Sequence, residues 1–247
     1  MQPYDQRFYD DLSDTALPSA RRVVPLLQAL MPIGSVVDVG CGNGSWLSVF
    51  RELGAERILG VDGDWIEIDR LLIPSECFHR VRLDQELGIG ERFDLAISLE
   101  VAEHLPAERA PSFVAELCQL APVVLFSAAV PHQGGLNHIN EQWPDYWAEH
   151  FARQGYRPID TIRFAVWEDP HVTWWYKQNL LLFASDEAMA RNERLAQEHD
   201  ASPQPPLRLV HPERYEIMAR DVTPSLGKWL RRGPQAFRAS FAKRKHK

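Results

Sequence analysis

Acidic residues follow three successive apolar segments of this chain, and the first of them stands among glycines. The stretch VVDVGCGNGSWL contains Asp38, Gly40, Gly42 and Gly44. Glycines let the backbone turn sharply and approach a ligand closely. Because Ser45 follows Gly44, the run is GxGxG and lacks the GxxG step of dinucleotide sites. A carboxylate beside such a turn favours a ligand with a cationic amine over one with a pyrophosphate.

Two further acids extend this pattern along the chain. Asp62 ends the segment GVD eighteen residues after Gly44, near the spacing at which an acid binds a ribose diol. One segment later, RLDQEL contains Leu83 and Asp84, which we expect at the edge of an adenine. A lone glycine turn is weak evidence, since such turns occur without ligands. Acids at the ends of three successive strands are stronger evidence, and together they predict a nucleoside site.

These residues can meet only if the apolar segments are parallel strands of one sheet. Strand-like runs occur at 35–39, 57–61, 78–83, 93–99, 123–129, 159–164 and 179–183. Helical spacing occurs at 18–30, 45–53, 65–71, 107–120 and 144–154. This alternation predicts an α/β fold with a doubly wound, mostly parallel seven-stranded sheet. The connection 165–178 contains no clear helix, which predicts an antiparallel closing hairpin for the last strand.

The expected organisation is a single catalytic domain with appendages. We expect an N-terminal lid or helix region at 1–34, a core at 35–185, a polar helix and Pro-containing linker at 186–224 and a basic tail at 225–247. The aromatic residues Tyr4, Phe8 and Tyr9 of the opening segment could form the lid. A docked terminus is the equal alternative.

Composition places the chain among cytoplasmic proteins. The opening MQPYDQRFYDDLSD is acidic and aromatic where a signal peptide would be basic and then apolar. The longest apolar stretch, 120–131, is far shorter than a membrane span. Cys41, Cys77 and Cys118 are odd in number and widely spaced, so they suggest neither a disulfide framework nor a zinc site.

Charge is distributed unevenly. Residues 225–247 hold eight Lys/Arg and no Asp/Glu, which leaves 19 basic against 34 acidic residues in 1–224. An acidic body argues against a nucleic-acid partner, because phosphate binding needs a positive surface. The tail interleaves Trp229, Leu230, Phe237 and Phe241 with its basic residues, as do segments that lie on anionic membranes or on acidic protein partners. A solubilising terminus is the alternative.

Residues 35–130 resemble a class I S-adenosylmethionine (SAM)-dependent methyltransferase. DVGCGNG resembles the first motif of that family, GVDGD the second and FDLAISLEVAEHL the fourth. A doubly wound sheet, SAM as cofactor and methyl transfer are what this resemblance implies. The residues implied around the methionyl part of SAM are Asp38, Gly40, Gly42, Asn43 and Gly44.

The nucleoside contacts follow from the same resemblance. Asp62 would bind the ribose hydroxyls, with Gly63 and Trp65 beside the adenosine. The other implied contacts are Leu83 and Asp84 for the adenine and Leu99 and Glu100 for the floor of the site.

The reacting side is expected just after the fourth strand, in LEVAEHLP. This stretch resembles that of small-molecule O-methyltransferases, in which a histidine here accepts a hydroxyl proton, so His104 is the first candidate for the base. Helix capping or packing is the equal alternative for His104. Metal binding by Glu100, Glu103 and His104 is a further alternative, as in some methyltransferases with this spacing. Spacing alone fixes no geometry, so a divalent metal is not favoured and no metal ligand is predicted.

The acceptor is expected over the polar run VPHQGGLNHINEQWPDYW. His138 is the second catalytic candidate. The stretch 137–146 looks similar to a bacterial methyltransferase group found alongside glycan-building enzymes, which implies a saccharide or another hydroxylated small molecule as acceptor. Second-tier acceptor contacts are His132, His138, Asn140, Glu141 and Trp143. Tryptophans that could form an aromatic wall, although ordinary packing is the commoner role, are Trp143, Trp147, Trp167, Trp174 and Trp175.

Two other classes of protein compete with a methyltransferase. A nicotinamide oxidoreductase would need the missing GxxG step and a hydride-handling site, and the sequence offers neither. A SAM-fold scaffold without chemistry is disfavoured by the presence of Asp38, Asp62 and Asp84.

Overall fold

A computed structural model describes residues 6–222 of the chain, and the side chains of 15–220. The chain divides into two compact units, Met1–Leu209 and Val210–Lys247. The described part of the second unit is 210–222, which contains the helix α9 (Pro212–Val222). The predicted basic tail and the lid side chains Tyr4, Phe8 and Tyr9 lie outside the described residues. Within the described part, no helix has the length and hydropathy required to span a bilayer.

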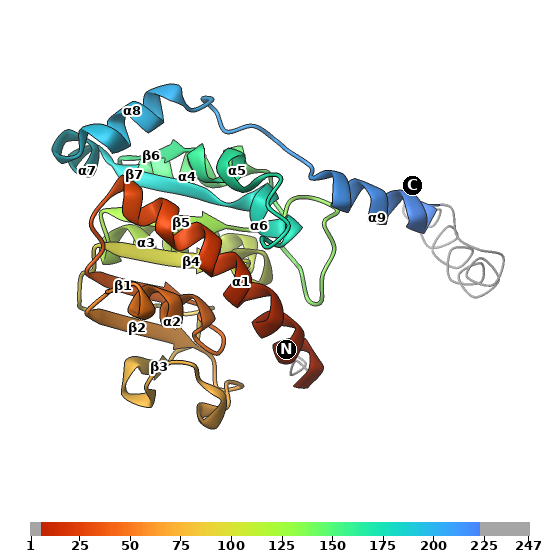
Figure 1. Ribbon diagram of the computed structural model, residues 1–247, viewed down its shortest axis with the longest axis horizontal. Helices are drawn as coiled ribbons and strands as arrows, with labels where there is room; N and C mark the ends of the chain where they lie inside the picture. The colour runs from red at the N-terminus through yellow and green to blue at the C-terminus, as the bar shows by residue number, and fades with distance from the viewer. Residues whose placement is uncertain (1–5, 223–247) are drawn as a thin grey trace. The chain divides into compact units, whose positions relative to one another are not determined.

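The first unit is built on one seven-stranded sheet (Figure 1). Its strands are β1 (Ser35–Val39), β2 (Arg57–Asp62), β3 (Phe78–Arg80), β4 (Leu95–Leu99), β5 (Val123–Ser127), β6 (Tyr156–Ile159) and β7 (Leu181–Ser185). The strand order is β3-β2-β1-β4-β5-β7-β6. Strands β1 to β5 are parallel, and β7 runs antiparallel to both β5 and β6. The order reverses between β1 and β4, and open α/β sheets bind ligands at the carboxyl edge of such a point.

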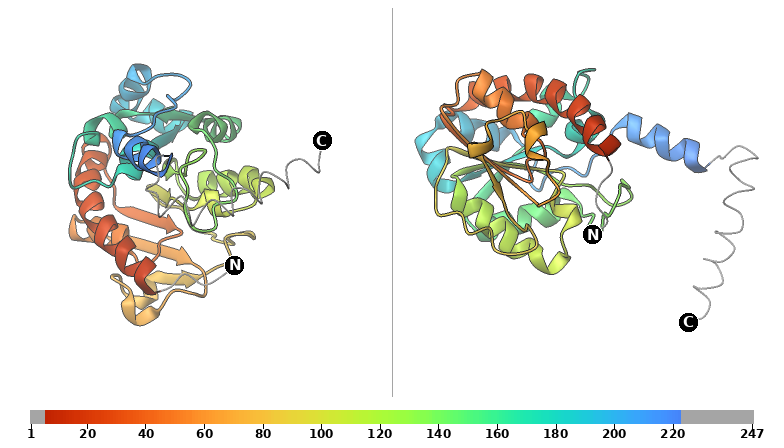
Figure 2. Two further views of the ribbon diagram at one scale, coloured as in Figure 1. Left: turned by 90° about the vertical axis from the view of Figure 1, so that its right-hand side faces the viewer. Right: turned by 90° about the horizontal axis from the view of Figure 1, so that it is seen from below.

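Helices cover both faces of this sheet. They are α1 (Gln6–Leu30), α2 (Ser45–Glu52), α3 (Ala110–Leu120), α4 (Pro144–Arg153), α5 (Thr161–Val166), α6 (Trp174–Asn179), α7 (Asp186–Arg191) and α8 (Glu193–Ala201). Residues of α1, α2, α5, α6 and α8 belong to one apolar cluster, and residues of α3 and α4 belong to the other. The right-hand view of Figure 2 shows the sheet between α1 and α2 on one side and α3 on the other.

The sequence pattern of each layer explains its burial. On α1, Ala20, Val23, Val24 and Leu27 are spaced three and four residues apart and are each at most 1% exposed. All five residues of β4 are buried, as expected for a strand covered on both faces. The expected doubly wound sheet with an antiparallel last strand is confirmed.

Three predicted elements are wrong in detail. The strand predicted at 159–164 lies earlier in the chain, at Tyr156–Ile159, and most of the predicted range belongs to the helix α5. The closing pair is antiparallel as predicted, but α5 and α6 occupy the connection that was expected to lack a helix. The predicted helix 65–71 is reduced to the 3₁₀ turn η1 (Ile68–Arg70). Short helices pay a large nucleation cost, and tertiary contacts that the sequence does not reveal decide whether they form.

The compact unit continues past the last strand. Asn192 ends α7 and caps α8, accepting hydrogen bonds from the backbone nitrogens of Arg194 and Leu195. Leu195 is 1% exposed and packs in the same apolar cluster as α1. The predicted boundary at residue 185 therefore marks the end of the sheet, while the unit itself extends to Leu209.

A fully buried arginine joins three segments of this unit. Arg163 on α5 donates from Nε to Asp160 Oδ1 at 2.6 Å, and its Nη2 donates to Asp160 Oδ2. Its Nη1 donates to the backbone oxygens of Gln178 at 3.0 Å and Leu207 at 3.1 Å. The guanidinium therefore fixes α6 and the segment after α8 relative to α5.

We expect Asp160→Asn to lower the free energy of unfolding by about 3–5 kcal/mol, because it leaves the buried Arg163 charge uncompensated. Urea denaturation of both proteins measures this difference. The matched control is Asp186→Asn, which breaks an ion pair with Arg157 whose side chains are each more than half exposed. The control should change stability by at most about 1 kcal/mol, and equal effects of the two substitutions would contradict the role of Arg163.

Candidate active site

The glycine-rich turn after β1 requires backbone conformations that side chains disfavour. Gly40, Gly42 and Gly44 have φ values of 88°, 54° and 81°. A Cβ atom at Gly40 would collide with the side chain of Val101, which follows β4. A Cβ at Gly44 would lie 2.9 Å from the side chain of Ile73. The turn is therefore held tightly against its neighbours and leaves its backbone nitrogens at the carboxyl edge of the sheet.

Two buried carboxylates stand beside this turn. Asp38 lies in β1 and is 3% exposed, and Asp62 ends β2 and is 6% exposed. The Asp62 carboxylate accepts hydrogen bonds from the backbone nitrogens of Gly42 at 2.8 Å and Gly63 at 2.6 Å, and from the Trp65 side chain. It therefore fixes the position of the glycine turn.

Burial governs the acidity of both groups. Burial raises the pKa of Asp62 to about 6, although its hydrogen bonds from Gly63, Gly42 and Trp65 act in the opposite direction. Burial, together with the nearby Asp62 charge, raises the pKa of Asp38 well above its usual range. A bound cation would favour the ionised form of both carboxylates.

A cavity opens next to Asp38. Leu99 at the end of β4 contributes to its wall, as do residues from α1, α2 and α6. The Trp46 and Tyr176 rings meet edge to face with centroids 5.3 Å apart. The lining residues are Ala16, Asp38, Gly40, Cys41, Gly42, Asn43, Ser45, Trp46, Leu99 and Tyr176.

The remaining predicted cofactor residues lie in different surroundings. The side-chain oxygen of Asn43 accepts hydrogen bonds from the nitrogen and hydroxyl of Ser45 at the start of α2. The Trp65 ring covers Gly63, where a Cβ would collide with it. Leu83 is buried. The Asp84 carboxylate is exposed to solvent and pairs with Arg82 at 2.7 Å.

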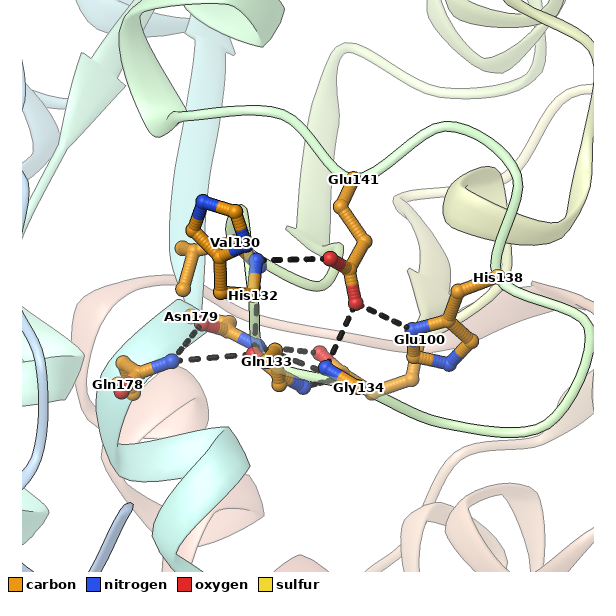
Figure 3. Close-up of polar contacts among 9 residues, drawn as sticks. All are labelled: Glu100, Val130, His132, Gln133, Gly134, His138, Glu141, Gln178 and Asn179. Atoms are coloured by element: carbon orange, nitrogen blue, oxygen red, sulfur yellow. Dashed lines mark hydrogen bonds and ion pairs between the residues drawn. The ribbon is translucent and has the colours of Figure 1, made fainter. Parts of the chain in front are cut away.

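Glu100 belongs to a buried network of amides rather than to the cavity wall (Figure 3). Its backbone has a φ of 57°, and its nitrogen donates to Ser127 at the end of β5. Its carboxylate accepts hydrogen bonds from Asn179 Nδ2 at 3.0 Å and from Gln133 Nε2 at 2.9 Å. Gln178 Nε2 donates to Gln133 at 3.0 Å. The network joins β4, α6 and the loop 128–143.

Glu141 holds the polar loop in shape. Its carboxylate accepts hydrogen bonds from the backbone nitrogens of His132 at 2.8 Å and Gly134 at 2.7 Å. The same group contacts His138 Nδ1 at 3.0 Å, as Figure 3 shows. His132, Gly134 and Asn137 all have positive φ, so Glu141 stabilises a tightly turned backbone.

The loop brings His138 against the turn that follows β4. The backbone nitrogens of Ile139 and Asn140 donate to the carbonyl oxygen of Glu103 at 2.9 and 3.0 Å. The rings of His104 and His138 meet edge to face with centroids 4.8 Å apart. Together, Glu103, His104 and His138 are the described residues that could hold a metal ion, and Glu100 is not among them.

Burial also sets the acidity of this second group. Burial, assisted by the neighbouring His138, lowers the pKa of His104 to about 4. The Glu103 side chain is fully buried, which raises its pKa well above the usual range. His104 is therefore neutral near pH 7 and has a lone pair to offer to a cation, whereas so low a pKa makes it a weak base.

Most of the other side chains predicted to contact the acceptor are buried or packed against neighbouring side chains. Asn140 is 3% exposed, and His132 is exposed. Trp147 is 2% exposed and packs on Phe126 in the core. The guanidinium carbon Cζ of Arg208 lies over the Trp143 ring, 5.6 Å from the ring centroid.

Several residues of the site were missed from the sequence. Cys41 and Trp46 belong to the glycine-turn segment and could have been assigned with it. Tyr176 and Gln178 carry no sequence signal, because they lie in the connection 165–178, for which no helix was predicted. Asn179 was predicted only as the first residue of the last strand.

Comparison with known proteins identifies the family. Residues 4–178 match the family described as "Methyltransferase domain". The ribosomal protein L11 methyltransferase of Thermosipho africanus is 32% identical over 105 residues, which are 40% of this chain and 38% of that protein. The ubiquinone biosynthesis O-methyltransferase of Methylobacterium sp. is 34% identical over 103 residues, which are 38% and 40% of the two chains. The matches thus span less than half of each relative's length.

Solved structures share the fold. DesVI of Streptomyces venezuelae has a TM-score of 0.55 at 13% identity, over 74% of this chain and 99% of that one. CalS10 of Micromonospora echinaspora, an amino pentose methyltransferase, has a TM-score of 0.52 at 12% identity, over 74% and 98% of the two chains. With the family match covering well over half of its residues, this chain belongs to the methyltransferase-domain family of class I SAM-dependent enzymes.

Proposed function

We propose that this protein transfers the methyl group of SAM to a hydroxyl group of a saccharide or other small-molecule acceptor, with an amine as the less favoured alternative to the hydroxyl. The observation that carries this proposal is the buried Asp62 carboxylate, held by the Gly42 and Gly63 nitrogens beside Asp38. Such a carboxylate can accept two hydroxyl hydrogens of a ribose.

The charge of the donor site suits SAM. SAM carries a sulfonium and an ammonium group, and Asp38 and Asp62 supply two carboxylates whose ionised forms burial disfavours. A cationic ligand compensates for that desolvation. A dinucleotide would instead bring a pyrophosphate towards two acids, so the nicotinamide alternative is disfavoured on electrostatic grounds.

The acceptor is assigned to the side where His104 and His138 meet. Methyl transfer is an in-line displacement, so the enzyme must orient the acceptor oxygen and dispose of its proton. His104 lies in the turn that follows β4, and His138 lies on the loop 128–143 that packs against this turn. Val101 of the same turn packs against Gly40 of the donor turn. This arrangement supports His104 and His138 as the residues that face the reacting hydroxyl.

Two of the similar proteins support a small acceptor, whereas the ribosomal protein L11 methyltransferase is named for a protein acceptor. One of these two proteins is named an O-methyltransferase of ubiquinone biosynthesis, and the other is named an amino pentose methyltransferase. Screening labelled SAM against sugars, nucleotide sugars, lipid-linked glycans and phenols tests the acceptor class. The proposal is wrong if the protein binds NAD in place of SAM, and a protein that binds SAM but methylates nothing in the screen would favour the scaffold alternative.

We expect Asp62→Ala to weaken SAM binding about 10- to 100-fold, since charge-assisted hydrogen bonds contribute about 1.5–3 kcal/mol. Isothermal titration calorimetry measures the change, and circular dichroism verifies that the variant is folded. Asp64→Ala, which removes an exposed carboxylate two residues away, is the matched control and should bind SAM normally. Normal SAM affinity in folded Asp62→Ala would refute the donor site.

SAM affinity should fall as pH falls through about 6, the raised pKa of Asp62. The ionised carboxylate binds the ligand, so each pH unit below this value should cost about tenfold in affinity. Titrations between about pH 8 and about pH 5 measure the profile. In Asp62→Asn, SAM affinity should depend less on pH, and the dependence that remains should come from Asp38. A wild-type profile already flat across this range would contradict the role of Asp62.

We also propose that the basic tail 225–247 attaches the enzyme to an anionic membrane surface, with about 1 kcal/mol from each basic residue near the lipid. At low salt, the full chain should co-sediment with anionic vesicles, and high salt should release it. A chain ending at Thr223 should stay in the supernatant. If both chains remain there at low salt, membrane attachment is wrong and a protein partner or a solubilising role remains.

A further inference from the structure

We infer that Glu103, His104 and His138 form a binding site for a divalent first-row transition-metal ion. Their candidate ligand atoms all lie within 4.8 Å of one another. Sequence spacing suggested Glu100 as the third ligand, but the amide network holds that carboxylate, and His138 arrives from a different loop. This set contains one carboxylate and two imidazoles, a combination that binds zinc, manganese and iron-group ions.

The strongest observation is the state of Glu103. Its side chain is fully buried, and neither carboxylate oxygen has a hydrogen-bond partner. The backbone groups of Glu103 and Ala129 act favourably on its charge but do not reach hydrogen-bond geometry. Burying a polar group without a partner is costly, and proteins offset such a cost by pairing the group or binding a metal to it. Two imidazoles beside the orphaned carboxylate complete the set of ligands.

Glu141 orients one of these imidazoles. Because Nδ1 of His138 contacts the Glu141 carboxylate at 3.0 Å, Nε2 is the nitrogen of this ring left to bind an ion. A carboxylate bonded to the second nitrogen of a histidine is the usual outer partner of a metal ligand. Gly135 makes room for the ring, since a Cβ atom there would collide with it.

The backbone preorganises the three ligands. Hydrogen bonds from Ile139 and Asn140 to the Glu103 carbonyl fasten the loop that carries His138 to the turn that carries Glu103 and His104. Ligands on one zinc ion lie about 3–4 Å apart, given metal–ligand distances of about 2.0–2.2 Å. Small side-chain rotations therefore suffice to close the site around an ion.

Three protein ligands leave coordination positions open, as in catalytic rather than structural metal sites. This part of the inference rests on the proposed function. The ion would bind the acceptor oxygen and make its O–H group more acidic, so that the proton would pass to water while the oxygen takes the methyl group from the sulfonium of SAM. His104 and His138 would then hold the ion instead of removing the proton themselves. The acceptor class would then be a hydroxyl that can reach the ion through its oxygen.

Cobalt binding tests the site independently of activity. The full chain is stripped of metal with a chelator and titrated with Co²⁺, whose visible absorption reports nitrogen and oxygen ligands in low coordination. We expect one Co²⁺ per wild-type chain and a rise in melting temperature on binding. Glu103→Gln and His138→Ala should lose both effects, and Glu141→Gln should weaken binding about 10- to 100-fold.

The choice of variants also separates loss of metal binding from loss of folding. Glu103→Gln replaces an unpaired carboxylate with a neutral group of the same shape, so without metal it should be at least as stable as the wild type. His171→Ala, at an exposed histidine away from the cluster, is the matched control and should bind Co²⁺ normally. Absence of Co²⁺ binding by the wild type, or equal binding by Glu103→Gln and His138→Ala, would overturn the inference.

SAM titration of the same samples separates this inference from the proposed function. A wild-type chain that binds SAM and transfers methyl groups without taking up Co²⁺ refutes the metal site alone. A chain that takes up Co²⁺ through Glu103 and His138 but binds no SAM supports the metal site and refutes the proposed function.

Discussion

The pairing of two buried carboxylates with a glycine turn is the constraint on which the rest of this site depends. Asp38 and Asp62 lie at the ends of adjacent parallel strands, where the register aligns Val39 with Val61. Two like charges in an apolar environment are unfavourable, so the fold must supply compensating dipoles. The Gly42 and Gly63 nitrogens do so, and Gly42 reaches Asp62 only because the turn adopts positive φ values. The glycines are therefore needed for the electrostatics as well as for space.

The donor turn is mechanically linked to the second half of the site. Val101 fills the space that a side chain at Gly40 would need, so the segment after β4 presses directly on the glycine turn. The same segment continues into Glu103 and His104, and Glu103 in turn binds the backbone of the loop 138–140. A displacement of the loop 128–143 would thus be transmitted to the glycine turn through packed atoms.

The sequence predicted the parts of the structure whose signal is local. Apolar runs located β1, β2, β4 and β5, because strands buried on both faces are continuously apolar. The prediction for 159–180 was wrong because TIRFAV has the composition of a strand. The sequence also does not indicate that Arg163 is buried in a helix, where Asp160 and two carbonyl oxygens accept its hydrogen bonds. Asp84 was expected at an adenine, and spacing could not predict that its exposed carboxylate pairs with Arg82.

The two halves of the site differ in how they are built, and this explains why one could be predicted and the other could not. The donor half uses backbone nitrogens and acids at strand ends, so its residues are adjacent in sequence to the elements that position them. The proposed acceptor half depends on a loop whose shape is fixed by one carboxylate, Glu141, bonded to His132, Gly134 and His138. Loops of this kind change without disturbing the sheet. A shared fold and family therefore constrain the glycine turn and its acids strongly, whereas the proposed acceptor side is formed by side chains that only the folded loop brings together.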